Sequence, residues 1–534
     1  MIPPLSRRRF LTMAGAGSAA VLVAACSGEV RPPVAIGPAD PAVGGAEGRR
    51  RRPGVRVTDV ALTATPFTVD LGGGLTAPTW AYGDTVPGTP IRLAAGEVLR
   101  ARFTNNLPEA TTVHWHGIAL RNNMDGVPGL TQPPVAPGES FLYEFTAPDP
   151  GTYWFHPHSG LQLDRGLYAP LIVDDPREPG AYDKEWVVVL DDWADGVGQP
   201  AEETLADLRA GRGAHAAHIA AAEGGGEAPS GGPFLQGAGA GDVVYPLYLL
   251  NGRQPSDPSV FEARPGERVR IRIINAGSDT PFRVALGGHR MTVTHTDGFP
   301  VEPVTVDALV VAMAERYDVV VTVGGSGVFP LVAEAEAKGN LAMGVLRSGP
   351  GELPPVGVLP AELTRRVLTM ADLRAAQGVR LPEGRPDRRH NLVLGEGPDG
   401  GYVWTINGRP HGRDEALPVE EGERVRLTFL NRSTMFHPMH LHGHTFQVLA
   451  PGGLGPRKDT TIVRAGENVA VEFVADNPGQ WMLHCHNLYH QAGGMMTTVS
   501  YVGDRPSTRS ELAAQRAAGW NPFTCSYDVP GSPT

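Results

Sequence analysis

One short stretch near the C-terminal end of the chain concentrates side chains that bind transition metals. Cys485 stands between His484 and His486, and His490 and Met495 follow within ten residues. Two histidines, one cysteine and a weakly bound methionine make the trigonal site of blue copper, so Cys485, His490 and Met495 can supply part of one. Neighbours in a strand point to opposite faces. His484 and His486 therefore predict a second metal site, whose other ligands lie elsewhere in the chain.

The elements that position this stretch belong to a pattern that occurs three times. Gly96, Gly266 and Gly422 each precede Glu and a run of strand-forming residues, about one domain length apart. The runs after Gly266 and Gly422 alternate polar and apolar residues with period two, which indicates half-buried β-strands. A second shared unit covers 137–156 and 465–484, and a weaker copy runs from Ala314-Glu315-Arg316 to Phe329. We predict an all-β chain of three Greek-key β-sandwich domains.

Eight histidines occupy matching positions in the first and third repeats. They form four His-x-His pairs: His114 and His116, His156 and His158, His440 and His442, His484 and His486. At the same offsets the middle repeat has Val284, Leu286, Val332 and Glu334. Alternation places both members of a pair on one face of a strand. Two domains that face each other could gather all eight imidazoles, which is enough for three metal ions, and the nearby cysteine favours copper.

His437 and Cys485 have no counterpart in the first repeat, which carries Thr111 and Pro157 instead. A mononuclear cysteine site is therefore expected in the third domain alone.

Length, charge and cysteine content restrict the possible functions. The chain has 534 residues, 68 Gly, 50 Pro and a formal net charge of −11. This composition favours many turns and short strands, and the negative charge argues against nucleic acid as a partner. The three cysteines, at 26, 485 and 525, do not form a disulfide framework.

The N-terminal residues are typical of an exported protein. Residues 6–11 read Ser-Arg-Arg-Arg-Phe-Leu and resemble a twin-arginine signal, which is followed by a small-residue apolar run that ends at Ala25. Val23-Ala24-Ala25-Cys26 resembles a bacterial lipobox, so we expect lipidation at Cys26 and a location on the extracytoplasmic face of the cell membrane. Residues 27–54 are rich in Pro, Gly and Ala and contain four arginines at 49–52. We interpret them as a flexible tether with a basic cluster near anionic lipid.

These observations divide the chain into segments. The predicted segments are a signal with lipobox (1–26), the tether (27–54), domain 1 (55–178), domain 2 (183–350), a linker (351–384), domain 3 (385–503) and a C-terminal tail (504–534). Residues 195–241 look like a Gly- and Ala-rich insertion with a little helix. The linker includes a candidate short helix at 370–377.

The histidine motifs together resemble the signatures of the multicopper oxidases. These motifs are His114-Trp115-His116-Gly117, His156-Pro157-His158, His437-Pro438-Met439-His440-Leu441-His442-Gly443 and His484-Cys485-His486 with His490 and Met495. Their order and spacing match that family over about 55–503. The resemblance implies three cupredoxin domains and four copper ions: one type 1 copper in the third domain, and one type 2 and two type 3 coppers between the first and third.

Ligand roles follow from the same resemblance. His437, Cys485, His490 and axial Met495 would hold the type 1 copper, and His114 and His440 the type 2 copper. The type 3 coppers would be held by His116, His156 and His486, and by His158, His442 and His484. The implied reaction is four one-electron substrate oxidations at type 1, with dioxygen reduced to water at the cluster. Cys485 would join the sites through its neighbouring histidines.

One acidic residue matches a family position for proton delivery. Asp125, in Met124-Asp125-Gly126, corresponds to an acid near the type 2 site. The alternative is an ordinary turn residue before Gly. Gln491 stands where some bacterial members have Glu after the second type 1 histidine, so an acid is missing there.

The electron donor is predicted from the surroundings of His437. Bacterial cuprous oxidases of this family carry Met two residues before that histidine, and here the residue is Met435. A thioether suits Cu(I), which favours a cuprous oxidase in copper tolerance with Met435 as docking ligand. Ser433 replaces the Asp of those enzymes, and the insertion at 195–241 contains no Met. A laccase-like oxidase of small phenolic donors is the alternative, and a non-catalytic copper-binding or scaffold protein is a third. We expect a monomer.

Overall fold

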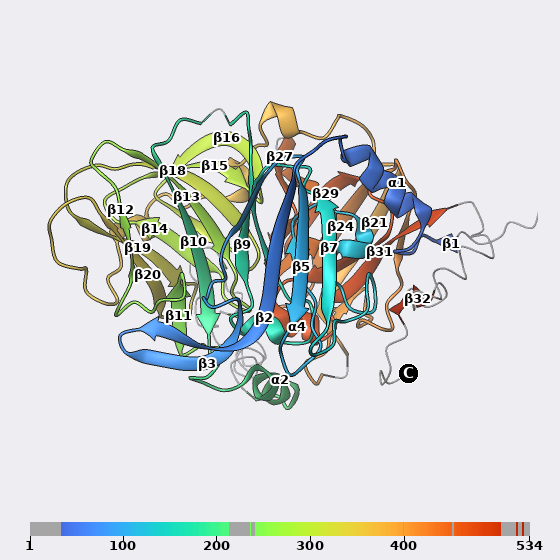
Figure 1. Cartoon of the computed structure of the whole chain (residues 1–534), viewed down its shortest axis with the longest axis horizontal. Helices are drawn as coiled ribbons and strands as arrows, with labels where there is room; N and C mark the ends of the chain where they lie inside the picture. The colour runs from blue at the N-terminus through green and yellow to red at the C-terminus, as the bar shows by residue number, and fades with distance from the viewer. Residues whose placement is uncertain are drawn as a thin grey trace, which may run out of the picture.

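The described part of the chain is almost entirely β-structure, arranged as three sandwiches (Figure 1). The computed structural model describes residues 34–178, 180–212, 235, 241–398, 400–450, 453–503, 520–521 and 526–527. The predicted signal with Cys26, most of the insertion and most of the tail with Cys525 lie outside the described residues. The predicted all-β, three-sandwich architecture is confirmed.

The first sandwich consists of two four-stranded sheets. In order across each sheet, the strands are β3 (Leu75–Tyr82), β2 (Val57–Gly72), β5 (Val98–Asn105) and β7 (Ser140–Thr146), and β4 (Ile91–Ala94), β9 (Ala169–Asp174), β8 (Gly151–His156) and β6 (His114–His116). Two 3₁₀ turns, η1 (Asn122–Met124) and η2 (Gln162–Asp164), lie in its loops.

The middle sandwich has a six-stranded and a five-stranded sheet. Their strands are β11 (Leu247–Leu250), β10 (Lys184–Trp193), β13 (Arg268–Asn275), β18 (Arg316–Thr322), β15 (Met291–Thr296) and β16 (Phe299–Val306), and β12 (Ser259–Glu262), β20 (Leu341–Arg347), β19 (Val328–Ala335), β14 (Phe282–Leu286) and β17 (Ala308–Val311). The helix α2 (Ala201–Arg209) lies in the expected insertion.

The third sandwich contains the cysteine motif. Its strands are β22 (Trp404–Ile406), β21 (Arg388–Glu396), β24 (Arg424–Asn431), β29 (Asn468–Val474), β26 (Phe446–Ala450) and β27 (Gly453–Lys458), and β1 (Val34–Ala35), β31 (Met496–Gly503), β30 (Gln480–Cys485), β25 (His437–Leu441) and β28 (Thr460–Val463), with β23 (Leu417–Val419) also paired to β31. The helix α4 (Leu488–Ala492) follows β30. The short strands β32 (Trp520–Asn521) and β33 (Ser526–Tyr527) pair with each other.

The repeated Gly-Glu turns mark equivalent strands, as predicted. They precede β5, β13 and β24, and each of these pairs in parallel with one strand and antiparallel with another, in the same order in all three sandwiches. The sequence repeat is therefore a structural repeat.

The predicted alignment of the middle repeat is wrong by one residue in its second unit. The amide of Asn275 bonds to the carbonyl of Glu315, as those of Asn105 and Asn431 bond to Glu139 and Glu467. Glu315, not Arg316, is therefore the counterpart of the two outer glutamates. Ala314 has a positive φ of 68°, and the glycines at this place in the other repeats, Gly138 and Gly466, have φ of 80° and 71°. Because Ala stands where the outer repeats have Gly, the sequence pattern aligns the middle repeat one residue out of place.

The same shift affects the strand that follows. Val284 lies opposite Ala333 on β19, so Ala333 occupies the place of His156, where Val332 was expected. The conclusion that the middle repeat lacks metal ligands at these positions does not change.

Residues 34–50 are ordered, which corrects the prediction of a flexible tether over them. β1 adds an antiparallel edge to β31, and α1 (Pro41–Arg50) follows. The side chain of Asp40 caps the first turn and accepts a hydrogen bond from the Ala42 amide at 2.8 Å, and Val43 and Ala46 are buried.

Three of the four arginines at 49–52 are engaged or buried within the protein, against the expectation of a lipid-facing cluster, and Arg52 is exposed. Arg49 and Arg51 form ion pairs with Glu421 and Glu144. Burial lowers the pKa of Arg50, although nearby carboxylates oppose this.

The linker contains 3₁₀ turns where one short helix was expected. The turns are η3 (Ala361–Thr364), η4 (Met370–Asp372) and η5 (Gln377–Val379). No helix in the described part of the chain combines the length and the apolar character needed to cross a bilayer.

The first prediction concerns the attachment of α1 to the body. The Glu47 carboxylate is 5% exposed and accepts hydrogen bonds from the Thr146 amide at 3.0 Å and hydroxyl at 2.8 Å. Glu47→Ala leaves both donors unpaired, so we expect a loss of about 2 kcal/mol in the free energy of unfolding. Denaturant titration measures it, with exposed Glu352→Ala as the control. Equal stability of the two variants would show that α1 is not held by this contact.

Candidate metal centres

Four short strands position the histidine pairs, and the second members of three pairs, His158, His442 and His486, come just after the ends of their strands. His114 on β6 lies opposite His156 on β8, and His440 on β25 lies opposite His484 on β30. The intervening Trp115 packs into the core of the first sandwich, as does Phe155 next to His156. Because alternate residues enter the core, the histidines point out of each sandwich.

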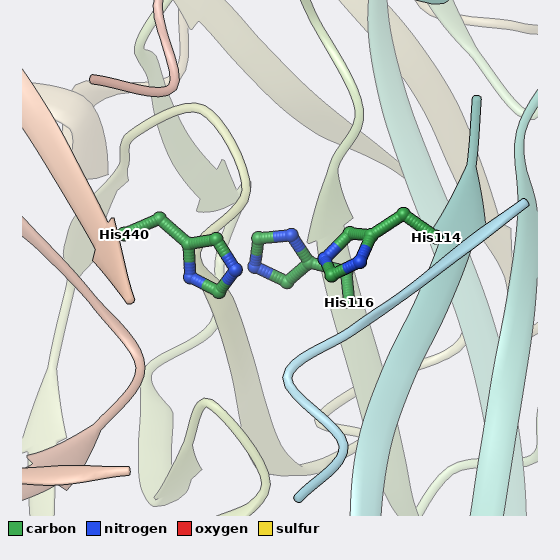
Figure 2. A group of neighbouring side chains, drawn as sticks. All are labelled: His114, His116 and His440. Carbon is green, nitrogen blue, oxygen red and sulfur yellow. The ribbon is translucent and has the colours of Figure 1, made fainter. Parts of the chain in front are cut away.

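The histidines of the first and third sandwiches meet face to face. The rings of His116 and His440 stack with centroids 3.8 Å apart, and those of His114 and His442 with centroids 3.9 Å apart. Figure 2 shows His440 facing His114 and His116 across the gap between the two domains. The eight side chains predicted from the four pairs are therefore gathered in one cluster.

Within this cluster, ligand atoms fall into groups of metal-binding size. Three groups have nitrogen atoms within 4.8 Å of one another: His114 with His116 and His440; His116 with His156 and His486; and His158 with His442 and His484. The last two groups are the sets that the resemblance assigned to the two type 3 coppers. The first contains both residues assigned to type 2.

The hydrogen bonds of the rings show which nitrogen atoms are left for metal. The Nδ1 atoms of His114, His156 and His440 contact backbone carbonyl oxygens at 2.8, 2.9 and 3.0 Å. Their Nε2 atoms are buried and have no hydrogen-bond partner among the described residues. An imidazole held at one nitrogen and unpaired at the other is an oriented metal ligand, so these residues fit the implied metals.

Burial favours the neutral form of several imidazoles of the cluster. It lowers the pKa of His116, His156, His442 and His484 well below the ordinary value, and neighbouring histidines lower it further. The same causes lower the pKa of His158 to about 3. Neutral imidazole is the form that binds metal, so at neutral pH these residues need not lose a proton to do so.

The cysteine site lies on the core side of β30. The Cys485 sulfur is 3.7 Å from His437 Nδ1 and 3.5 Å from His490 Nδ1, and the two nitrogens are 3.0 Å apart. Burial raises the pKa of the Cys485 thiol well above its usual range, so copper binding must displace its proton. Met495, the predicted axial ligand, is fully buried, and its carbonyl accepts from the Cys485 amide at 3.0 Å.

The outer nitrogens of the two cysteine-site histidines are held by different partners. His437 Nε2 contacts the Ser433 hydroxyl at 2.7 Å, and His490 Nε2 contacts the Asp242 carboxylate at 2.8 Å. Asp242 is 1% exposed and also accepts from the Tyr402 hydroxyl. Asp242 was missed in the sequence because no motif surrounds it.

Two further features adjoin His437. Met435, the predicted substrate ligand, is 1% exposed and packs in the same core as Cys485. Ser433 lines a groove of about 420 Å³ together with Val393, Glu396 and Thr434. The groove therefore approaches the cysteine site from the His437 side, and Met435 does not line it.

Asp125 joins ligands of the two domains. Its carbonyl contacts His114 Nδ1 at 2.8 Å, and its carboxylate contacts His442 Nδ1 at 2.9 Å. Asp125 is completely buried. Its predicted role in proton delivery stays a prediction, but its contacts give it a role in orienting both rings.

Asp459, which the sequence did not single out, makes a second set of such contacts. Its carboxylate is 3.2 Å from His116 Nε2, and its carbonyl is 3.0 Å from His440 Nδ1. His116 Nδ1 is then the nitrogen left for metal.

Comparison with known proteins decides the family. Multicopper oxidase family models match residues 63–178, 184–350 and 385–504. The chain belongs to the multicopper oxidase family. It is 48% identical to multicopper oxidase MmcO of Mycobacterium tuberculosis, with 93% of this chain and 97% of that one covered. Copper is accordingly its cofactor, and it is an oxidoreductase.

Other relatives differ in their described roles. A copper resistance protein A homolog of Pseudomonas syringae pv. tomato is 31% identical and covers 84% of this chain and 92% of its own. The crystal structure of a laccase from Botrytis aclada is 25% identical with a TM-score of 0.70, covering 87% of this chain and 92% of that one. The chain is thus similar both to a protein named for copper resistance and to a laccase.

The second prediction tests the orienting contact of Asp125. Asp125→Ala removes the partner of His442 Nδ1, and loss of such a contact typically weakens metal affinity about 10- to 100-fold. We expect copper to leave the histidine cluster at lower chelator concentration, as followed by metal analysis after dialysis. Exposed Asp84→Ala is the control. Unchanged copper retention in Asp125→Ala would contradict an orienting role.

Proposed function

We propose that this multicopper oxidase oxidises Cu(I) to Cu(II) in copper tolerance, with dioxygen as the electron acceptor. When bound, the coppers supply one-electron oxidation at Cys485 and reduction of dioxygen to water, so that four Cu(I), one dioxygen and four protons give four Cu(II) and two waters. The names of the copper resistance relatives support this donor. The main support is the turn before His437, which places the Met435 thioether two residues from that histidine.

That turn is fixed by hydrogen bonds. The Asn431 side-chain amide donates to the Met435 carbonyl at 2.7 Å, and the Met435 amide donates to the Ser433 hydroxyl at 3.2 Å. The same hydroxyl contacts His437 Nε2. Ser433 thus connects the segment that carries the soft Met435 sulfur to a cysteine-site ligand. An electron donor bound at this segment would be separated from the Cys485 sulfur by two side chains, those of Ser433 and His437.

Small phenolic donors are the second candidate. Met435 is buried, whereas the groove beside Ser433 is open and lined by polar and apolar side chains. An organic donor could occupy this groove and pass an electron through Ser433 and His437 without contact with Met435. The laccase relative supports this reading.

The third prediction separates the two donors by two variants. Met435→Ala removes the soft ligand, so we expect slower oxygen uptake with Cu(I) and little change with a phenolic donor. Thr434→Trp narrows the groove, so we expect a higher KM for the phenolic donor and little change for Cu(I). Oxygen uptake is measured for both variants with both donors.

The control for this pair is the blue absorption of the cysteine site, which both variants should keep. Unchanged cuprous turnover in Met435→Ala would remove Met435 as a docking ligand. Selective loss of phenol oxidation in Thr434→Trp, with poor cuprous turnover in the unaltered protein, would favour the laccase-like function.

We also propose that the protein is exported and anchored to the membrane by lipid on Cys26. The support is the N-terminal sequence alone. The fourth prediction is that Cys26→Ser moves the protein from the membrane fraction to the soluble fraction without loss of bound copper. Membrane association that persists in this variant would contradict the lipid anchor.

A further inference from the structure

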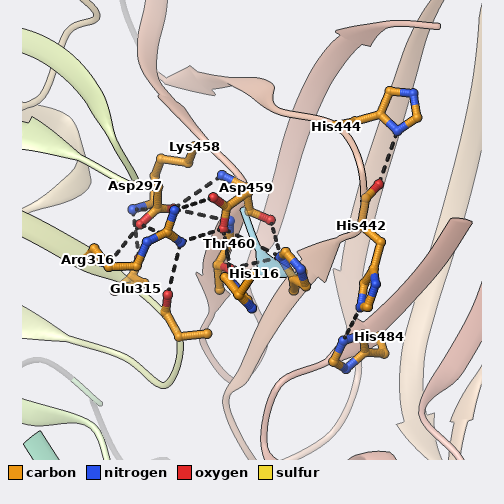
Figure 3. Close-up of polar contacts among 12 residues, drawn as sticks. His116, Asp297, Glu315, Arg316, His442, His444, Lys458, Asp459, Thr460 and His484 are labelled. Carbon is orange, nitrogen blue, oxygen red and sulfur yellow. Dashed lines mark hydrogen bonds and ion pairs between the residues drawn. The ribbon is translucent and has the colours of Figure 1, made fainter. Parts of the chain in front are cut away.

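One arginine of the middle sandwich contacts all three domains beside the histidine cluster. Arg316, the first residue of β18, is completely buried. Its two terminal nitrogens donate to the two carboxylate oxygens of Asp459, in the third sandwich, at 2.7 and 2.6 Å. Its Nε donates to the Thr152 carbonyl, on β8 of the first sandwich, at 3.0 Å. Figure 3 shows this side chain reaching from the middle domain towards Asp459.

The carboxylate that Arg316 binds also contacts a predicted copper ligand. Asp459 Oδ1 lies 3.2 Å from His116 Nε2 and accepts from the Thr460 hydroxyl at 2.9 Å. That hydroxyl is also 3.1 Å from His440 Nδ1. Arg316 is therefore one residue away from a ligand of each outer domain. The fork of a guanidinium fixes both oxygens of a carboxylate, which a point charge does not.

The surroundings fit this ion pair closely. Asp297 accepts hydrogen bonds from the backbone amides of Asp459 and Thr460 at 3.2 and 3.1 Å, and Lys458 lies 3.1 Å from it. A side chain at Gly117, the residue after His116, would collide with both the Arg316 guanidinium and the Asp459 carboxylate. A buried charge pair needs such complete pairing, because removal of one partner leaves the other unpaired.

Of the three repeats, the middle one alone has arginine at the position of Arg316. Its structural counterparts, one residue after the equivalent glutamates, are Ser140 and Asn468. The outer domains carry the ligands, and only the middle one carries arginine here.

We propose that Arg316 is a positioning residue for the histidine cluster. Through Asp459 it fixes the rings of His116 and His440, and so it sets the copper occupancy of the cluster without acting on the Cys485 site. The copper-free middle domain thereby contributes to the active centre. This inference does not depend on which electron donor the enzyme uses.

The test uses the full-length, copper-loaded protein. Arg316→Met and Arg316→Lys are compared with Arg270→Met, a matched control that breaks another buried ion pair of the middle domain, with Asp318 at 2.6 Å. Copper content, the electron paramagnetic resonance signal of type 2 copper, the blue absorption of Cys485 and the melting temperature are measured for each variant.

We expect selective loss in the Arg316 variants. Arg316→Met should lose cluster copper at about 10- to 100-fold lower chelator concentration and change the type 2 signal, while the blue absorption stays. Arg316→Lys should retain cluster copper better than Arg316→Met but less well than the unaltered protein, since Lys restores the positive charge without the two-pronged guanidinium. Arg270→Met should keep its full copper content even if its melting temperature falls.

If Arg316→Met does not fold, Asp459→Asn provides the test. It keeps the shape of the side chain and removes the negative charge that Arg316 binds. It should show the same selective loss. The proposal is overturned if Asp459→Asn or a folded Arg316→Met keeps cluster copper and an unchanged type 2 signal. It is also overturned if Arg270→Met loses cluster copper to the same extent.

Discussion

The alternation of side chains along four short strands is the constraint on which this structure depends. On β6, β8, β25 and β30 alternate residues, such as Trp115, Phe155 and Leu483, pack into a sandwich core, and the histidines between them lie on the other face. Large buried residues such as Trp115 and Phe155 fix the strands, so the histidines beside them cannot slip to the other face. Two packed cores thus hold one set of imidazoles between them. At Cys485 the same alternation turns the sulfur inward, towards His437 and His490.

Polar contacts complete what the strands begin. Asp125 and Asp459 approach the cluster from the first and third domains, and each contacts one ligand through a carbonyl and another through a carboxylate. The buried Arg316 and Asp297 stabilise the second of these groups from the middle domain. The metal centre therefore extends over all three sandwiches, although its ligands come from two.

The sequence was sufficient to predict which histidines the structure gathers with one another and which lie beside Cys485, because these residue types are rare and their spacing repeats. Asp459 and Arg316 have common side chains, and only the packing of three domains makes their ion pair a buried one. One signal existed for Arg316, the departure from Ser140 and Asn468, but Ala314 replaced the expected glycine and shifted the alignment. The segment 34–50 was misinterpreted because its composition is that of a linker, whereas Asp40 and a few buried side chains suffice to hold a helix against the body.

The pairing of β1 with β31 joins the beginning of the described chain to nearly its end. The edge strand β1 is synthesised early and its partner β31 late, so the copper-binding sheet cannot form until almost the whole chain has been synthesised. The histidine cluster likewise needs strands from the first and third domains. Contacts so distant in sequence form late and slowly. Copper loading is thus a step that follows synthesis of the complete chain, and a truncated product cannot assemble the cluster.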